Sequence, residues 1–397
     1  MDFSIPAEWE RQRRLGAQLW SESVDATGRD RSADYASNPR RRRDLVARIG
    51  AQGPARALLP VSQGGGGLSV QEAAAQLEAL GEAAADPLLT LAVAAHGLLV
   101  TGALRELDTD SQHHLHLLDL VNGDRIGAVS LTEVDGLAAG AAGAVRARRE
   151  PGGWVLQGTK PAVVNADLAD LLLLTAVTDS GTASTGTAST GTSSRVPQLS
   201  SFLVDLTACG VQVLATGGPG APWLGEVVLR GVRVDDDALL GTPGRALQEL
   251  VPLLATLERS LLLAPWLGAL RAVAAETVRA ATTEQLFGRS RARSQSVRAA
   301  LADIQSQLEL LAGLVHRACW QLDTLAEVPR ADGAAARLYL SQVVDDVLVL
   351  AARVQGPAGL RPQRALTRLR TAAALLPVFG GPDITRAVVA GALVGLG

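Results

Sequence analysis

The side chains that could take part in proton transfer are few, and one of them stands out by its surroundings. Glu258 and Arg259 interrupt the most apolar long stretch of the sequence, residues 250–274. A carboxylate in such surroundings would have a raised pKa, which suits a proton acceptor working near neutral pH. The alternative is that Glu258 pairs with Arg259 or another basic group and stabilises helix packing. Both interpretations stay open at this stage.

Histidine and cysteine do not form a metal-ligating pattern. His113, His114 and His116 stand close together, but no carboxylate or cysteine joins them at ligand spacing. Cys209 and Cys319 are too few and too far apart for a disulfide framework or a metal site, so we expect reduced thiols. The sequence therefore predicts no metal site and fits a reducing cytoplasm.

The composition is that of an ordinary globular protein. The 397 residues are 47% hydrophobic with a formal net charge of −3. Residues 40–43 form an arginine run, for which a solvated helix start is the favoured interpretation, and no nucleic-acid partner is indicated. The N-terminus lacks the apolar core of a signal peptide, and Glu258, Arg259 and Arg271 interrupt the apolar stretch. We expect a soluble, cytoplasmic protein without membrane insertion.

Apolar periodicity divides the chain into three parts. Residues 1–124 have helical spacing, residues 125–240 hold strand-like runs, and residues 241–397 are helical again with four long periodic stretches. Residues 178–196 form a low-complexity insert that is too polar to fold by itself. We predict an α+β protein with an N-terminal helical domain, a middle β-barrel or sandwich domain and a C-terminal four-helix bundle.

Motifs in the middle part carry a family resemblance. They are Leu131-Thr132-Glu133, Gly152-Gly153-Trp154-Val155-Leu156-Gln157-Gly158-Thr159-Lys160 and Asn165-Ala166-Asp167-Leu168-Ala169-Asp170. They resemble the middle domain of the acyl-CoA dehydrogenase family, with its Thr-Glu turn, Gly-x-Trp/Tyr-x-Leu-x-Gly-x-Lys and Asn-(Gly/Ala)-x-x-Ala-Asp. The resemblance extends over essentially the full length. It implies α,β-desaturation of an acyl-CoA thioester with FAD, and a homo- or hetero-oligomer, dimer or tetramer, formed through the C-terminal bundle.

The resemblance also implies roles for particular residues. In many members the base lies in a Tyr-Glu-Gly-Thr turn, which falls here on Phe379 or Gly380, and neither can accept a proton. A second group, which includes isovaleryl-CoA dehydrogenases, has its base in a Leu-x-x-Glu-Arg segment. That segment makes Glu258 the candidate base and Arg259 a candidate substrate-binding residue. The candidate FAD contacts are Leu131, Thr132, Phe287, Gln355 and Gly356.

Five positions at which the family holds FAD have changed. The serine of Pro-x-x-Gly-Ser is missing near Ala138, Ala162 replaces the aromatic residue that packs on the flavin, and Val164 replaces the hydroxyl that bonds flavin N5. Across the subunit interface, Glu284 replaces the pyrophosphate-binding arginine, and Arg353 replaces a glutamine. A carboxylate facing a pyrophosphate is unfavourable. We expect FAD to be weakly bound, shared with a partner subunit, or absent.

Three interpretations of the function remain open. The preferred one is a subunit of a heteromeric FAD-dependent acyl-CoA dehydrogenase whose own flavin site is degenerate. The second is a self-sufficient dehydrogenase that uses Glu258 as base. The third is a non-redox protein that binds acyl thioesters or serves as a scaffold, since a fold does not dictate function.

Overall fold

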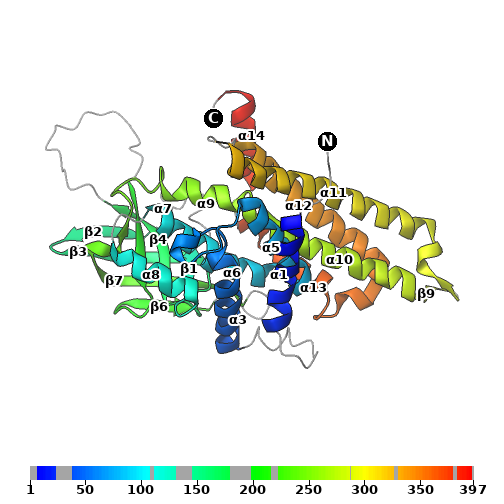
Figure 1. Cartoon of the computed structure of the whole chain (residues 1–397), viewed down its shortest axis with the longest axis horizontal. Helices are drawn as coiled ribbons and strands as arrows, with labels where there is room; N and C mark the ends of the chain where they lie inside the picture. Colours follow the sequence, from blue (N-terminus) through cyan, green and yellow to red (C-terminus); the bar gives the residue numbers. More distant parts are fainter. Residues whose placement is uncertain are drawn as a thin grey trace.

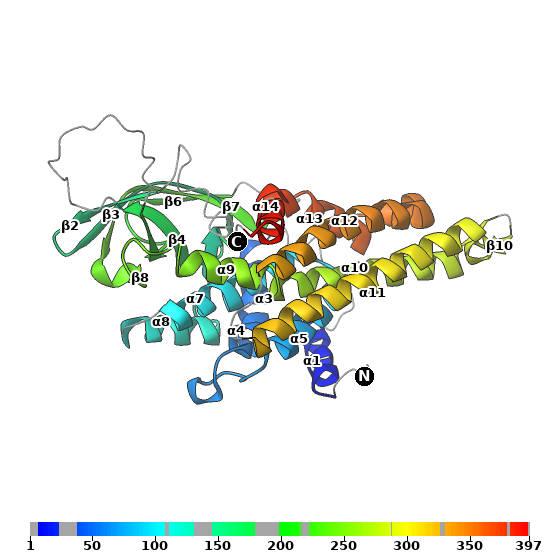
Figure 2. The same ribbon diagram turned by 90° about the horizontal axis from the view of Figure 1, so that it is seen from above.

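Helices from both ends of the sequence pack together, and a sheet lies at one end of the resulting elongated molecule (Figure 1). The structure is a computed structural model that describes residues 7–23, 38–107, 111–130, 145–178, 198–215, 222–286, 288–325, 330–378 and 382–395. Seen from above, the long helices α10, α11 and α12 run away from the sheet side by side (Figure 2). This arrangement confirms the predicted α+β fold class.

The N-terminal helices begin where the sequence supplies caps. They are α1 (Ala7–Ser23), α3 (Pro39–Gln52), α4 (Pro54–Ala57), α5 (Val70–Ala84), α6 (Pro87–Ala94), the π-helix η2 (Ala95–Val100), α7 (Thr101–Leu107) and α8 (Ser111–Asn122). Asn38 caps α3 by accepting from the Arg41 backbone N–H, and Pro39 follows at the first helical position. At α5, Ser69 and Glu72 form a reciprocal capping box.

Eight of the strands among the described residues form one mixed sheet. They are β1 (Gly127–Ser130), β2 (Arg146–Glu150), β3 (Gly153–Val164), β4 (Leu171–Thr178), β5 (Leu199–Asp205), β6 (Val211–Leu214), β7 (Leu224–Asp235) and β8 (Leu239–Leu240). The order is β6-β7-β3-β1-β4-β5-β8, and β2 also pairs with both β3 and β4. Because β1 and β2 both join β3 to β4, the sheet curls around its own apolar core. Trp154 and Phe202 meet edge to face in that core, with centroids 5.6 Å apart.

The C-terminal part returns to helices, as the four periodic stretches predict. The elements are α9 (Leu250–Glu258), α10 (Ala264–Thr283), the hairpin β9 (Gln285–Leu286) and β10 (Arg289–Ser290), α11 (Gln295–Thr324), α12 (Arg330–Gln355), α13 (Ala365–Ala373) and α14 (Pro382–Leu393). One hydrophobic core runs through the helices of both ends of the chain, from Leu19 to Leu376, and it includes one face of the sheet.

Two glycines allow α5 and α10 to approach backbone to backbone. A Cβ at Gly268 would stand 1.9 Å from the Glu78 carbonyl oxygen, and a Cβ at Gly81 would stand 2.3 Å from the Pro265 carbonyl oxygen. No side chain fits at either position without moving a helix. The N-terminal helices and the bundle are therefore interlocked.

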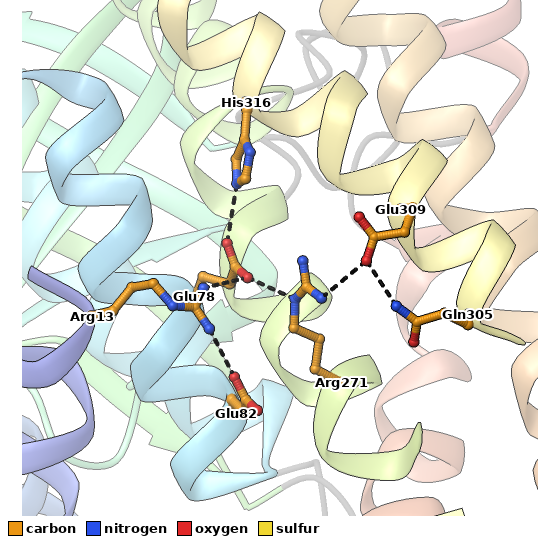
Figure 3. Close-up of polar contacts among 7 residues, drawn as sticks. All are labelled: Arg13, Glu78, Glu82, Arg271, Gln305, Glu309 and His316. Carbon is orange, nitrogen blue, oxygen red and sulfur yellow. Dashed lines mark hydrogen bonds and ion pairs between the residues drawn. The ribbon is translucent and has the colours of Figure 1, made fainter. Parts of the chain in front are cut away.

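A buried carboxylate ties the same helices together (Figure 3). The Glu78 side chain, 1% exposed, accepts hydrogen bonds from Arg13 of α1 at 2.6 Å and from Arg271 of α10 at 2.8 Å. His316 Nε2 of α11 lies 3.1 Å from its second oxygen. Burial alone would raise the pKa of Glu78, but the hydrogen bond with His316 and the charges of Arg13 and Arg271 outweigh it and lower the pKa to about 2.

The solvated interpretation of the arginine run is wrong for Arg42 and Arg43. Arg42 is buried, stacks over the Trp223 ring at 5.7 Å, and donates to the Pro222 carbonyl and the Asp167 carboxylate. Arg43 pairs with Asp170 at 2.8 Å. These contacts dock α3 onto the segments that flank β4 and β7. Sequence reasoning missed them because the partner residues lie more than a hundred positions away.

Two helical stretches of the described chain are long and apolar enough to cross a membrane. They are Pro87–Leu107 and Leu250–Thr283, and 94% and 72% of their apolar windows are buried inside the protein. Their apolar character is therefore used largely in packing against other helices.

Candidate active site

Glu258 ends α9, and its carboxylate is buried between guanidinium groups. Leu250, Leu254 and Leu257 form the buried face of the helix, and Glu258 continues that face. Arg337 of α12 donates from Nε to Oε1 at 2.9 Å, and Arg259 Nε lies 3.9 Å from Oε2. The carboxylate thus belongs to a buried ion pair, which is the alternative that the sequence left open. Catalysis by Glu258 stays a prediction.

Arg337 joins the two segments on which family members carry the base. Besides Glu258, it donates to the Leu376 carbonyl oxygen at 2.7 Å and to the Ser341 hydroxyl at 2.8 Å. Leu376 lies three residues before Phe379, and Phe379 and Gly380 are outside the described residues. Sequence reasoning missed Arg337. The available signal was its position on the apolar repeat of α12, three residues before the buried Leu340.

A pocket of about 270 Å³ opens on the other face of α9. Thr256 of α9 and Arg259, which follows the helix, line it together with Gln321 of α11, Arg330 of α12 and Val388 of α14. Glu258 is not part of the lining. The buried Arg259 Nε makes no hydrogen bond to any described residue. Two arginines and few other polar groups make this pocket suited to the polar or anionic end of a largely apolar ligand.

Strand β1, which leads into Leu131-Thr132-Glu133, pairs with β3, which carries the glycine–lysine motif. Ser130 of β1 stands opposite Val163 of β3, and its hydroxyl donates to the Pro161 carbonyl oxygen at 2.9 Å. Leu131, Thr132 and Ala138 follow directly but lie outside the described residues.

The positions on β3 offer a flavin nothing to bind. Ala162 sits at a register shift with φ 51°, and it packs against the helical core. Val164 is fully buried in that core. A buried valine side chain cannot donate a hydrogen bond or reach a ring outside the core.

Two bundle residues at positions assigned to the cofactor, Gln355 and Glu284, are paired within the chain. Gln355 is buried and donates from Nε2 to the Thr277 hydroxyl at 2.8 Å, so it does not face outward. Gly356 follows with φ 61°, and Phe287 is outside the described residues. The Glu284 carboxylate pairs with Arg291 at 3.1 Å. The described residues on both sides of the site therefore do not fit FAD.

The buried histidine His96 has a structural role, since it is bonded to the backbone of β1. His96 lies on the π-helix η2 and accepts at Nδ1 from the Gly127 backbone N–H at 3.1 Å. Burial, with the nearby charge of Arg43, lowers the pKa of His96 to about 4, so the ring is neutral at physiological pH. Among the described residues, no cluster of His, Cys, Asp and Glu could hold a metal ion.

Comparisons with known proteins agree with this architecture. The family domain described as "Acyl-CoA dehydrogenase, C-terminal domain" matches residues 254–393. L-prolyl-[peptidyl-carrier protein] dehydrogenase of Pseudomonas fluorescens is 25% identical over 366 residues, with 90% of each chain covered. Benzylmalonyl-CoA dehydrogenase of Aromatoleum aromaticum is 29% identical over 336 residues, with 83% of this chain and 84% of the relative covered.

Solved structures show the same fold over the whole length. The FAD complex of PigA superposes with a TM-score of 0.83 at 22% identity, covering 100% of both chains. Butyryl-CoA dehydrogenase of Megasphaera elsdenii gives 0.83 at 21% identity, covering 99% of this chain and all of the other. The chain therefore shares its fold with these two proteins. These findings support the acyl-CoA dehydrogenase family for this chain: residues 254–393 match its C-terminal domain, and benzylmalonyl-CoA dehydrogenase is similar over 83% of the chain.

Proposed function

We propose that this chain is a subunit of a heteromeric acyl-CoA dehydrogenase in which a partner of the same family supplies the complete flavin site. The observation that carries this proposal is the state of the flavin positions. Val164 is buried in the core and the Glu284 carboxylate is paired with Arg291, while the pocket beside Arg259 remains open. A chain that keeps a ligand pocket but loses its cofactor contacts is suited to act with a partner.

Arg259 and Arg330 are the residues of this chain that would bind the substrate. Their guanidinium groups suit the polar part of an acyl thioester, and the apolar side chains of α9 that line the pocket, Val251, Pro252 and Ala255, suit its aliphatic part. The names of relatives support this class, since one is a dehydrogenase of a carrier-protein prolyl group and another of an acyl-CoA. Assembly as a dimer or tetramer through the bundle and a cytoplasmic location belong to the same proposal.

In such an assembly Glu258 is either the catalytic base or only the ion-pair partner of Arg337, and a substitution distinguishes the two roles. Glu258→Gln keeps a hydrogen-bond acceptor for Arg337 and removes the proton acceptor. If Glu258 is the base, the folded variant loses turnover by about a hundredfold or more. Loss of the buried charge opposite Arg337 should lower its melting temperature in either role, so turnover is measured below the melting temperature of the variant. Glu249→Gln, at the opposite end of α9, is the matched control and should keep full activity.

The proposal is tested by purifying the chain alone and together with a co-expressed family member that retains the flavin motifs. Absorbance measures bound flavin, and dichlorophenolindophenol reduction with acyl-CoAs measures activity. We expect flavin and activity only in the pair. Stoichiometric flavin in the chain alone would contradict the proposal and favour the self-sufficient dehydrogenase. Acyl-CoA binding without flavin or activity in either sample would favour the non-redox protein.

A further inference from the structure

The segment that follows α10 is a tight hairpin with opposite charges at its base. Strands β9 and β10 pair, and Gly288 turns with φ 74°. One step beyond the paired strands, the Arg291 backbone N–H donates to the Glu284 carbonyl oxygen at 3.1 Å. The side chains of the same two residues meet as an ion pair at 3.1 Å. The backbone therefore holds the two charges face to face.

The Arg291 guanidinium also reaches the C-terminal end of α12 and the glycine that follows it. Its NH1 donates to the Val354 carbonyl oxygen at 2.7 Å and lies 3.8 Å from where a Cβ on Gly356 would be. Gly356 has a left-handed backbone, which favours glycine, and it places no side chain next to the Arg291 guanidinium. A cation is thus fixed against a glycine turn, a combination that suits an anion with several oxygens.

We propose that this is an anion-binding site for a pyrophosphate group that the chain's own Glu284 carboxylate closes. Glu284 neutralises Arg291 and places a negative charge where a second anion would have to enter. The proposal deepens the proposed function, on which it rests for the assignment of the hairpin to the cofactor side. It identifies the bundle half of the flavin site as blocked by one carboxylate, which stands at the position of the family's pyrophosphate-binding arginine and holds Arg291 in an ion pair.

The local charge balance supports this interpretation. Arg289 and Arg293 flank Arg291 along the chain, and the exposed Arg353 lies near the C-terminal end of α12. Glu284 is the acidic residue that the structure places on the Arg291 side chain. Removal of its charge would take away the carboxylate that pairs with Arg291, whereas Arg353 shares a pocket with Asp303 and Asp346.

The test uses Glu284→Gln in the full chain, titrated calorimetrically with inorganic pyrophosphate and with ADP at low ionic strength. Because the ion pair is partly exposed, we expect binding about tenfold tighter than in the wild type. Added salt should reduce the difference. Glu10→Gln, an exposed carboxylate on α1, has the same charge change away from the hairpin and should leave the affinity unchanged.

A second variant keeps the test decisive. Glu284→Gln combined with Arg291→Gln should lose the gained affinity, and melting curves establish that both variants are folded. Equal affinity of the wild type and Glu284→Gln for both anions would overturn the inference, as would a double variant that binds as well as the single one. Neither outcome bears on the proposed function, which fails instead if the wild-type chain alone holds stoichiometric FAD.

Discussion

Substitution of Glu78 by glutamine gives the sharpest test of how the helices are held together. The carboxylate is 1% exposed and its pKa falls from the ordinary 4.5 to about 2. At roughly 1.4 kcal/mol per pKa unit, the ionised group contributes about 3 kcal/mol to folding at neutral pH. Glu78→Gln should lower the free energy of unfolding at pH 7 by about that amount, measured by urea denaturation.

The pH dependence has a definite sign. Because the folded-state pKa is lowered, this stability is fully present above about pH 4.5 and is lost as the pH falls toward 2. Near pH 3.5 the wild type should have lost roughly 1.4 kcal/mol through Glu78, whereas the variant loses none through that position. The difference between the two proteins should therefore narrow to about 2 kcal/mol.

The matched control for Glu78 is Glu82→Gln, one turn later on α5. Glu82 shares the partner Arg13, at 3.1 Å, but its side chain is 40% exposed. Exposed pairs contribute at most about 1 kcal/mol. A Glu78→Gln effect that is no larger than the control, or that does not change between pH 7 and pH 3.5, would refute the electrostatic account.

Two further substitutions test close packing and docking. Gly268→Ala puts a Cβ 1.9 Å from a carbonyl oxygen of α5 and should lower the free energy of unfolding, measured by thermal denaturation, by about 3 kcal/mol or more. The Cβ of Gly313→Ala meets nothing within 4 Å, so this control should stabilise α11 by up to about 1 kcal/mol. Equal effects of the two alanines would contradict the close-approach argument. Arg42→Met leaves Asp167 without its buried partner and should lower the free energy of unfolding by about 3 kcal/mol. It should also expose Trp223, which a change in tryptophan fluorescence would report. The control Arg40→Met, in the same arginine run, should change neither the stability nor the fluorescence.

More of the fold than of the candidate site could be predicted from the sequence, for physical reasons. Periodicity and capping are local, so the helix–strand–helix order and the starts of α3 and α5 could be predicted. The pairing of Glu258 with Arg337 could not be predicted, because its residues are 79 positions apart. The same holds for Arg42 with Asp167.

The flavin positions show a different limit. Spacing identified Ala162, Val164 and Glu284 as replacements, but only the fold shows that Val164 is buried and that Glu284 has Arg291 as a partner. Sequence reasoning suggested that Gln355 could take over a cofactor contact. In the structure, the Gln355 amide instead donates a hydrogen bond to the Thr277 hydroxyl inside the bundle.

The interlocking of α5 with α10 also sets the order of events during synthesis. Glu78 and Arg271 are 193 residues apart, so α5 leaves the ribosome long before its partner exists. At about 5–20 residues per second, the wait is roughly 10–40 s. During that time the apolar faces of the N-terminal helices have no bundle to cover them, and association with other exposed chains competes with folding. Translation speed and chaperones thus become determinants of how much functional subunit a cell obtains.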